Sequence, residues 1–256
     1  MSFVDEINHN NVLIVGASQG IGLGFVQLLL QDDRIAKTYA TYRQLESASE
    51  LRALKDKYPE RLICLSMDIT DELQIVECVQ QIRTEVNKLH LVVNCVGLLH
   101  EGSVQPEKSL RQIDPERLLR YFQVNSIGSV LLAKHLLSLF KHSDRSVFVS
   151  ISAKVGSIGD NQLGGWYGYR ASKAALNMFM RNVAIEYGRT CPKTLVVMLH
   201  PGTTDTRLSR PYQGNVPAEK LFSVERTVTQ LLAVIEQLQD GDSGQFFSWD
   251  GSRLPW

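Results

Sequence analysis

The 256-residue sequence lacks both a long hydrophobic run and an excess of charge of either sign. Lysine plus arginine and aspartate plus glutamate each total 27, so the formal net charge is zero with histidine neutral. This balance argues against nucleic acid or an acidic membrane as the main partner. The longest apolar stretch, 130–140, is interrupted by Lys134 and His135, and residues 1–10 carry two acids and no apolar segment. We therefore expect neither a signal peptide nor a transmembrane helix.

Cysteine is also scarce. Cys64, Cys78, Cys95 and Cys191 lie far apart in the sequence and show no C-x-x-C spacing. Such a distribution is not typical of a zinc site or of a disulfide framework, and it favours buried thiols. We therefore expect a protein of a reducing, cytoplasmic compartment without a bound metal.

The sequence does contain a regular alternation of strand-like and helix-like segments, with 44% hydrophobic residues, enough for one large core. Unbroken apolar runs are typical of strands buried on both faces, and the segments between them have helical periodicity. We predict strands at 11–15, 37–42, 62–66, 89–94, 146–151, 195–200 and 244–248, and helices at 20–31, 45–58, 71–86, 115–140, 167–188 and 224–238. This order predicts an α/β protein with a single domain over 1–256. Its sheet is Rossmann-type, doubly wound, seven-stranded and parallel, with helices on both faces.

Local signals support several of these boundaries. Asp114 can cap the helix that begins at Pro115, and Ser223 can cap the last helix. Gly188 is the predicted stop of the preceding helix. The segment 203–222 has prolines and glycine but weak helical periodicity, and it is longer than an ordinary connector. We predict that it forms a substrate lid; the alternative is an ordered surface loop.

The first predicted strand runs directly into a glycine-rich turn, G-A-S-Q-G-I-G. A strand, a tight turn and a helix in this order present unpaired helix amides to an anion such as a pyrophosphate. The predicted cofactor-binding residues here are Gly16, Ser18, Gly20, Ile21 and Gly22. The same letters satisfy G-x-S-x-G, the nucleophile elbow of α/β-hydrolases, with Ser18 as the nucleophile. That interpretation is disfavoured, because a hydrolase needs several strands before its elbow and only about ten residues precede the single strand that leads into this turn.

A tyrosine and a lysine lie four residues apart in the stretch Y-R-A-S-K, at Tyr169 and Lys173. On a helix this spacing places both side chains on one face. A positive charge about 5 Å away is worth roughly 3 kcal/mol at an effective dielectric near 20, enough to bring a phenol pKa from about 10 toward about 8. We therefore expect Tyr169 to act as a proton donor and acceptor near neutral pH.

The glycine turn and the Tyr169–Lys173 pair together make the chain resemble the short-chain dehydrogenase/reductase family. Further matches follow in family order, with M-D-I-T at 67–70, N-C-V-G at 94–97, Asn125, and P-G-T-T-D-T at 201–206. The resemblance implies cofactor contacts from Asp68, Ile69, Asn94, Val96, Gly97, Pro201, Gly202, Thr204 and Thr206, besides Tyr169 and Lys173. More narrowly, V-G-S-I at 155–158, G-G-W-Y at 164–167 and the L-P-W ending are similar to the C-factor and sniffer-type carbonyl reductase branch.

This resemblance implies an oxidoreductase that moves a hydride between a nicotinamide and a carbonyl or alcohol, with Tyr169 as general acid and base. Lys173 would lower the pKa of Tyr169 and hydrogen-bond the nicotinamide ribose. Asn125 would hold a water that returns a proton toward Lys173; otherwise it is a kink or packing residue. The family also implies a homodimer or homotetramer packed through the helices 115–140 and 167–188.

The serine that orients the substrate carbonyl is the point at which this chain departs from the family pattern. The family has two serines at the end of the fifth strand, of which the second is catalytic, whereas this chain has S-I-S-A at 150–153. Ala153 stands at the second position, so the role passes to Ser152 or is absent. We predict Ser152, with Ser150 and Ser157 as alternatives.

The choice of cofactor depends on the end of the second strand, A-T-Y-R at 40–43. Folds that prefer NAD usually place a carboxylate there, which accepts hydrogen bonds from the ribose 2′-hydroxyl. Here Arg43 can instead make a charge-assisted fork to a 2′-phosphate. NADP(H) is therefore favoured over NAD(H). The alternative is that Arg43 is a solvated cation and that Glu46 serves an NAD ribose.

The expected pocket walls mix apolar and polar groups without a repeated charge, which favours a small or medium apolar carbonyl compound. These walls are Leu98, Leu99, His100, Ile158, Trp166 and the segment 203–222, in which Arg207, Arg210 and Tyr212 can face a substrate. A non-catalytic dinucleotide-binding sensor or signalling protein of the same fold is the alternative. The presence of Tyr169, Lys173 and Asn125 favours catalysis.

Overall fold

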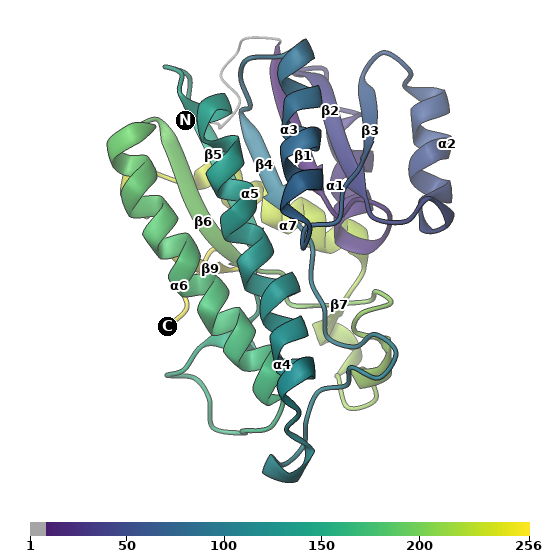
Figure 1. The fold of residues 1–256 in the computed structure, drawn as a ribbon, viewed down its shortest axis with the longest axis vertical. Coiled ribbons are helices and arrows are strands. Elements are labelled where there is room, and N and C mark those ends of the chain that lie inside the picture. The colour runs from purple at the N-terminus through teal and green to yellow at the C-terminus, as the bar shows by residue number, and fades with distance from the viewer. Residues whose placement is uncertain (1–8) are drawn as a thin grey trace.

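A parallel sheet of seven strands forms the centre of the protein (Figure 1). The computed structural model describes residues 9–256. The strand order is β3-β2-β1-β4-β5-β6-β9, and every pairing in it is parallel. The strands are β1 (Asn10–Val15), β2 (Ile35–Tyr42), β3 (Leu62–Ser66), β4 (Leu91–Asn94), β5 (Ser146–Ile151), β6 (Thr194–His200) and β9 (Phe246–Ser248). The predicted seven-stranded parallel sheet is confirmed. Its order reverses between β1 and β4, where such folds bind ligands beyond the strand ends.

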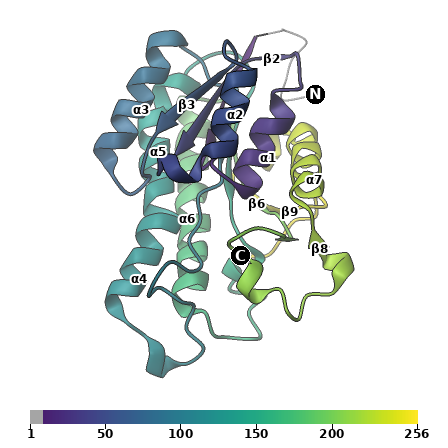
Figure 2. The same cartoon turned by 90° about the vertical axis from the view of Figure 1, so that its right-hand side faces the viewer.

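Helices cover both faces of this sheet, as predicted (Figure 2). One face packs on α1 (Gly20–Leu29), α2 (Ser49–Lys57) and α7 (Val224–Gln237), and the other on α3 (Glu72–Glu85), α5 (Gly128–Leu136) and α6 (Tyr167–Thr190). Alternate residues of β1 divide between the two cores, since Val12 and Ile14 pack in the first and Leu13 and Val15 in the second. Because both faces are buried, the strands read as unbroken apolar runs.

The predicted helix 115–140 is not one regular helix. It consists of α4 (Pro115–Phe122), a π-helical segment (Gln123–Ile127), α5, and a short 3₁₀ segment (Leu137–Phe140). The π segment holds Asn125, whose side chain bonds the backbone of Leu98 in a distant loop. Single turns of π-helix inside α-helices are frequent at functional sites.

Two of the predicted helix starts are confirmed, and the predicted helix end at Gly188 is wrong. Asp114 accepts a hydrogen bond from the Arg117 amide at the start of α4, and Ser223 accepts one from the Arg226 amide at the start of α7. Helix α6 continues through Gly188 to Thr190. It ends where Pro192 follows, because proline has no amide hydrogen to continue the ladder.

The predicted lid segment, 203–222, is tied at both ends. Its first residues form β7 (Thr203–Thr204), which pairs in parallel with β8 (Leu221–Phe222) at its end. The chain between them folds into 3₁₀ turns at Arg210–Tyr212 and Ala218–Lys220. The segment is thus closed at its base, and its role as a substrate lid stays a prediction. Among residues 9–256, no helix combines the length and apolar character that crossing a bilayer requires.

Candidate active site

The glycine turn forms a tight cradle between β1 and α1. Gly16 and Gly20 have φ angles of 77° and 56°, in the left-handed region that favours glycine. A Cβ at Gly22 would overlap the carbonyl of Gly16, so the turn closes on itself. Within the described residues, no side chain caps the first turn of α1. Its amides are therefore available to an anion, as expected for a pyrophosphate site that also includes Ser18 and Ile21.

The turn after β4 is held against this cradle by an asparagine. The Oδ1 atom of Asn94 accepts a hydrogen bond of 3.1 Å from the Val96 amide, and its Nδ2 atom donates to Ser129. A Cβ at Gly16 would lie 2.8 Å from Cγ2 of Val96. A Cβ at Gly97 would lie 3.6 Å from Nζ of Lys173. Asn94, Val96 and Gly97 thus lie between the glycine cradle and the Tyr169–Lys173 pair.

Asn125 fixes the same turn from the other side. Its Oδ1 atom accepts a hydrogen bond of 2.6 Å from the Leu98 amide, and its Nδ2 atom donates to the Leu98 carbonyl at 2.9 Å and to Ser172 Oγ at 3.0 Å. The side chain is 1% exposed. It therefore joins the loop after β4 to the first turns of α6, which is a positioning role. The water relay stays a prediction.

Tyr169 and Lys173 lie in the first turns of α6, and both are buried. The Lys173 Nζ atom lies 5.9 Å from the centroid of the Tyr169 ring and donates to the Ile151 carbonyl at 3.0 Å. Gly156 presses on the lysine stem, since a Cβ there would lie 2.7 Å from Cβ of Lys173. The lysine is thereby held in one place by β5 and the loop that follows it.

Burial dominates the electrostatics of this pair. It raises the pKa of the Tyr169 phenol and lowers the pKa of Lys173 to about 8. The expectation that Lys173 brings the pKa of Tyr169 toward neutrality is therefore wrong for the protein without a cofactor. Desolvation of the Tyr169 phenolate outweighs its attraction to the Lys173 ammonium. A low pKa keeps Lys173 able to give up a proton near neutral pH.

The geometry does not support the prediction for Ser152. Its hydroxyl donates a hydrogen bond of 2.7 Å to Oδ1 of Asn177 on α6, and both residues are buried. Ala153 packs in the same apolar cluster as Tyr169. Of the alternatives, Ser157 accepts a hydrogen bond from the Asp160 amide, and Ser150 is fully buried within β5. Ala153, at the position where the resemblance implies the family's serine, has only a methyl group.

Arg43 and Asp68 follow the ends of β2 and β3, the neighbouring strands on one side of β1. Arg43 is exposed and pairs with Glu101 at 2.6 Å. Asp68 accepts hydrogen bonds from the amide and hydroxyl of Thr70. Ile69 is buried beneath Gly128 of α5, where any Cβ would strike the Ile69 carbonyl.

The P-G-T-T-D-T segment after β6 completes the cradle. Gly202 has a φ of 73° and no room for a Cβ beside the Phe222 ring, and Pro201 is buried. Thr204 hydrogen-bonds Thr227 of α7 at 2.9 Å. A Cβ at Gly20 would lie 3.2 Å from Cγ2 of Thr206, so the segment closes against the glycine turn.

A row of aromatic rings extends from Tyr169. Trp166 lies edge-on to both Tyr169 and Tyr212, with centroids 6.1 and 5.1 Å apart, and Tyr212 lies edge-on to His100 at 5.9 Å. Leu98 and Leu99 are buried in the same cluster. This part of the predicted wall is brought together. Ile158 is not part of it, because its side chain is 77% exposed.

The two predicted substrate-facing arginines are placed differently from Tyr212. Arg210 is 73% exposed and pairs with Asp205 at 3.7 Å. Arg207 is exposed, and its carbonyl is 3.3 Å from Nε2 of His100. The segment 203–222 therefore contacts the loop after β4 through its backbone and Tyr212, whereas the Arg210 guanidinium lies at the surface.

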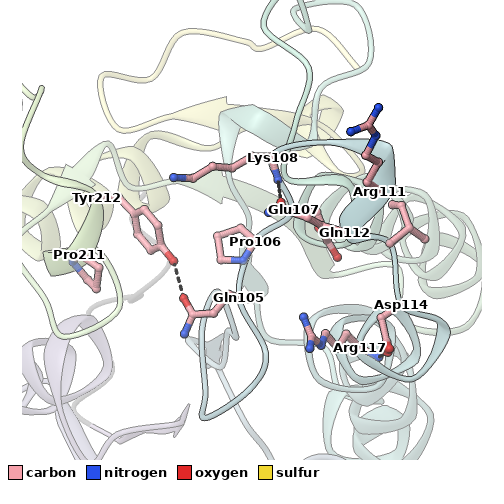
Figure 3. A pocket seen from close by; sticks show the side chains of 11 residues that line it. Gln105, Pro106, Glu107, Lys108, Arg111, Gln112, Asp114, Arg117, Pro211 and Tyr212 are labelled. Atoms are coloured by element: carbon pink, nitrogen blue, oxygen red, sulfur yellow. Dashed lines mark hydrogen bonds between the residues drawn. The ribbon is translucent and has the colours of Figure 1, made fainter.

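A cavity of about 620 Å³ opens beside this aromatic cluster, between the lid and the residues that precede α4 (Figure 3). The Tyr212 hydroxyl donates to Gln105 across its mouth at 3.2 Å. Glu107, in its wall, accepts a hydrogen bond from the Gly168 amide and so anchors the start of α6. Sequence reasoning missed Glu107, since a single acid in a polar loop carries no local signal of this contact.

Comparison with known proteins identifies the family. The chain has a Rossmann-type oxidoreductase fold, and its residues 10–216 match the family model "short chain dehydrogenase". The chain belongs to this family. It is 30% identical to the benzil reductase ((S)-benzoin forming) of Saccharomyces cerevisiae, over 95% of this chain and 97% of that protein.

Two solved structures share the whole architecture. The NADPH-bound carbonyl reductase from chicken fatty liver superposes with a TM-score of 0.87 at 29% identity, covering 98% of this chain and 100% of the other. The carbonyl reductase Sniffer of D. melanogaster superposes with a TM-score of 0.85 at 26% identity, covering 97% and 100%. The resemblance to the sniffer-type branch is thus confirmed.

Proposed function

We propose that this protein is an NADP(H)-dependent carbonyl reductase that uses Tyr169 as its general acid. The observation that carries the proposal is the convergence of Tyr169 and Lys173, both buried, on the turn after β4, beside a glycine cradle with uncapped helix amides. The NADPH bound in the structure of the chicken relative supports the same cofactor for this chain.

The residues present fit a dinucleotide. Gly16, Gly20 and Gly22 keep the turn free of side chains, so that backbone atoms line it. The unpaired amides of α1 suit the pyrophosphate of the dinucleotide. Arg43 suits a 2′-phosphate, because a guanidinium fork matches phosphate geometry. Asp68 would contact the adenine end, as the family resemblance implies. When bound, the nicotinamide supplies the hydride.

Each side chain of the site then has a definite task. Tyr169 holds the proton that the developing alkoxide takes up, and its burial keeps the phenol neutral until that moment. Lys173 orients the cofactor ribose and can restore the proton of Tyr169, since its own pKa is about 8. Asn125 keeps the turn at Leu98 in register with α6 and relays protons through water.

The substrate we propose is an apolar carbonyl compound with an aromatic part. Trp166 lies edge-on to Tyr169, Tyr212 lies edge-on to Trp166, and His100 lies edge-on to Tyr212. Such a row of rings favours a further ring. Leu98 and Leu99 add apolar surface. The name of the yeast relative specifies benzil, an aromatic diketone, which fits a wall of this kind.

A panel assay tests the proposal. Purified protein is mixed with NADPH and with benzil, activated aromatic aldehydes and quinones, and both cofactor consumption and alcohol formation are measured. We expect turnover with aromatic carbonyls and far less with NADH. The proposal would be rejected if NADPH were consumed without formation of an alcohol. It would also be rejected if no carbonyl compound led to consumption of NADPH.

One observation favours a second candidate, a dinucleotide-binding sensor without catalysis. Ala153 belongs to the same apolar cluster as Tyr169, and the family resemblance places the catalytic serine at its position. A protein that only binds the cofactor does not need that hydroxyl. Under this alternative, NADPH binds tightly in the same panel assay but is not consumed.

We also propose that the protein forms a homo-oligomer through α4, α5 and α6. Met178 and Ile185 are exposed and lie seven residues apart on one face of α6. Leu119 of α4 and Ile127 of the π segment between α4 and α5 are exposed as well. Light scattering coupled to size-exclusion chromatography tests this; a monomer at micromolar concentration would contradict it.

A further inference from the structure

The side chain of Arg43, the residue suited to a 2′-phosphate, is held by a carboxylate. Its Nη2 atom lies 2.6 Å from Oε1 of Glu101, in the turn that follows β4. The other oxygen of Glu101 lies 3.4 Å from Nη2 of Arg120 on α4. Glu101 therefore shares its charge between two cations on different elements. The arginine lowers the pKa of Glu101, so the carboxylate is charged at neutral pH.

The position of this ion pair in the fold gives it a functional meaning. Strands β2 and β4 flank β1 in the sheet, and Arg43 and Glu101 follow the ends of β2 and β4. The pair therefore joins the two sides of the glycine turn at the end of β1, where a dinucleotide would lie. Asp68, after β3, contributes a second negative charge near Arg43.

We propose that Glu101 is a specificity-determining residue that competes with the cofactor 2′-phosphate for Arg43. The inference rests on the proposed use of NADP(H). A carboxylate and a phosphate both accept the guanidinium fork, but the phosphate carries the larger charge. NADPH therefore displaces Glu101 from Arg43, whereas NADH, which has no 2′-phosphate, leaves the pair in place.

Arg120 makes this exchange feasible. When Arg43 turns to the phosphate, Glu101 still faces Arg120 and is not left without a counter-charge. The side chains of Arg43 and Glu101 are 43% and 42% exposed, so neither loses much solvation during the change of partner. Glu101 thus reduces the affinity for NADPH by the strength of one surface ion pair and leaves the affinity for NADH unaffected.

Equilibrium binding of NADPH and NADH to the full chain tests this inference. The proteins are wild type, Glu101→Gln, Arg43→Gln and the double variant. Glu50→Gln serves as the matched control, since it removes one exposed carboxylate from the first turn of α2. Surface ion pairs are worth about two- to fivefold in an equilibrium constant, so Glu101→Gln should lower the Kd for NADPH by that factor. The Kd of Glu101→Gln for NADH should stay at the wild-type value. The Kd of Glu50→Gln for NADPH should also stay at the wild-type value.

The double variant identifies the cause. In the Arg43→Gln background, Glu101→Gln should have no effect on NADPH, because the group for which it competes is gone. An unchanged or raised Kd for NADPH in Glu101→Gln would overturn the inference, as would equal tightening of NADPH and NADH or the same gain in the Arg43→Gln background. A wild-type protein that prefers NADH, with Arg43→Gln affecting neither cofactor, would instead refute the proposed cofactor choice. Thermal unfolding of each variant verifies that it is folded.

Discussion

Substitution of Ser152 by alanine should weaken the fold and leave catalysis nearly intact. The Ser152 hydroxyl donates to Oδ1 of Asn177, and the two residues are 2% and 3% exposed. Its removal leaves a buried acceptor without its donor, which costs about 1–3 kcal/mol. In a domain of this size, such a loss lowers the Tm by about 2–12 °C. The hydroxyl is directed at α6, so kcat/KM measured well below the transition should change less than about threefold, against the 10²-fold or greater loss expected for an oxyanion donor.

The control lies on β5, the strand that ends immediately before Ser152. Ser146 of β5 makes a buried hydroxyl contact with Thr194 at 2.8 Å, at the end of the strand away from the site. Ser146→Ala should therefore reproduce the loss of Tm with unchanged kinetics. If Ser152→Ala instead lost 10²-fold or more in kcat/KM at an unaltered Tm, the hydroxyl would turn to the substrate during the reaction. Ser152 would then supply the hydroxyl that the family has at the position of Ala153.

Two further predictions concern charge. Arg43→Ala should weaken NADPH binding by about 1–3 kcal/mol and leave NADH binding nearly unchanged. This is the value of a charge-assisted contact, less the strength of the Arg43–Glu101 ion pair that NADPH must break in the wild type. Calorimetric titration with both cofactors measures the two losses, and equal losses would refute the prediction. Burial lowers the pKa of Lys173 from 10.5 to about 8. The unfolded chain therefore binds more protons between these values, so the lysine's contribution to stability improves as pH rises from about 8 to about 10.5. The stability of wild type relative to Lys173→Met, from urea unfolding at pH 7 and pH 10, should accordingly rise toward pH 10, and a flat difference would contradict the burial of a titrating lysine.

Much of the fold could be predicted from the sequence because its signals are local. The strands at 62–66 and 146–151 match the structure at both ends, since each is an apolar run bounded by polar residues. The helix over 115–140 was predicted as continuous, yet it contains a π segment. Asn125 bonds the backbone of Leu98, 27 residues earlier in the chain, and such a tertiary contact leaves no periodic trace in the sequence.

The site divides in the same way. The glycine turn and the Tyr169–Lys173 pair follow from short motifs, and the structure brings them to one end of the sheet. The direction of the Ser152 hydroxyl depends on Asn177, 25 residues away on α6, and the partner of Arg43 is 58 residues away. The sequence predicts a lowered pKa for Tyr169, whereas burial raises it. Spacing predicts a nearby cation, but burial depends on how the whole core closes around the phenol.

The central claim is that Tyr169 gives the proton in an NADPH-dependent carbonyl reduction. The most direct test compares wild type with Tyr169→Phe at saturating NADPH and an aromatic dicarbonyl, measuring alcohol formation and, separately, NADPH binding. We expect the variant to bind NADPH as wild type does, because the ring packing against Trp166 and Tyr121 remains. Its rate should fall by about 10²-fold or more, since only the proton donor is lost. A variant that keeps more than about a tenth of the wild-type rate would contradict the claim and assign the proton to another group.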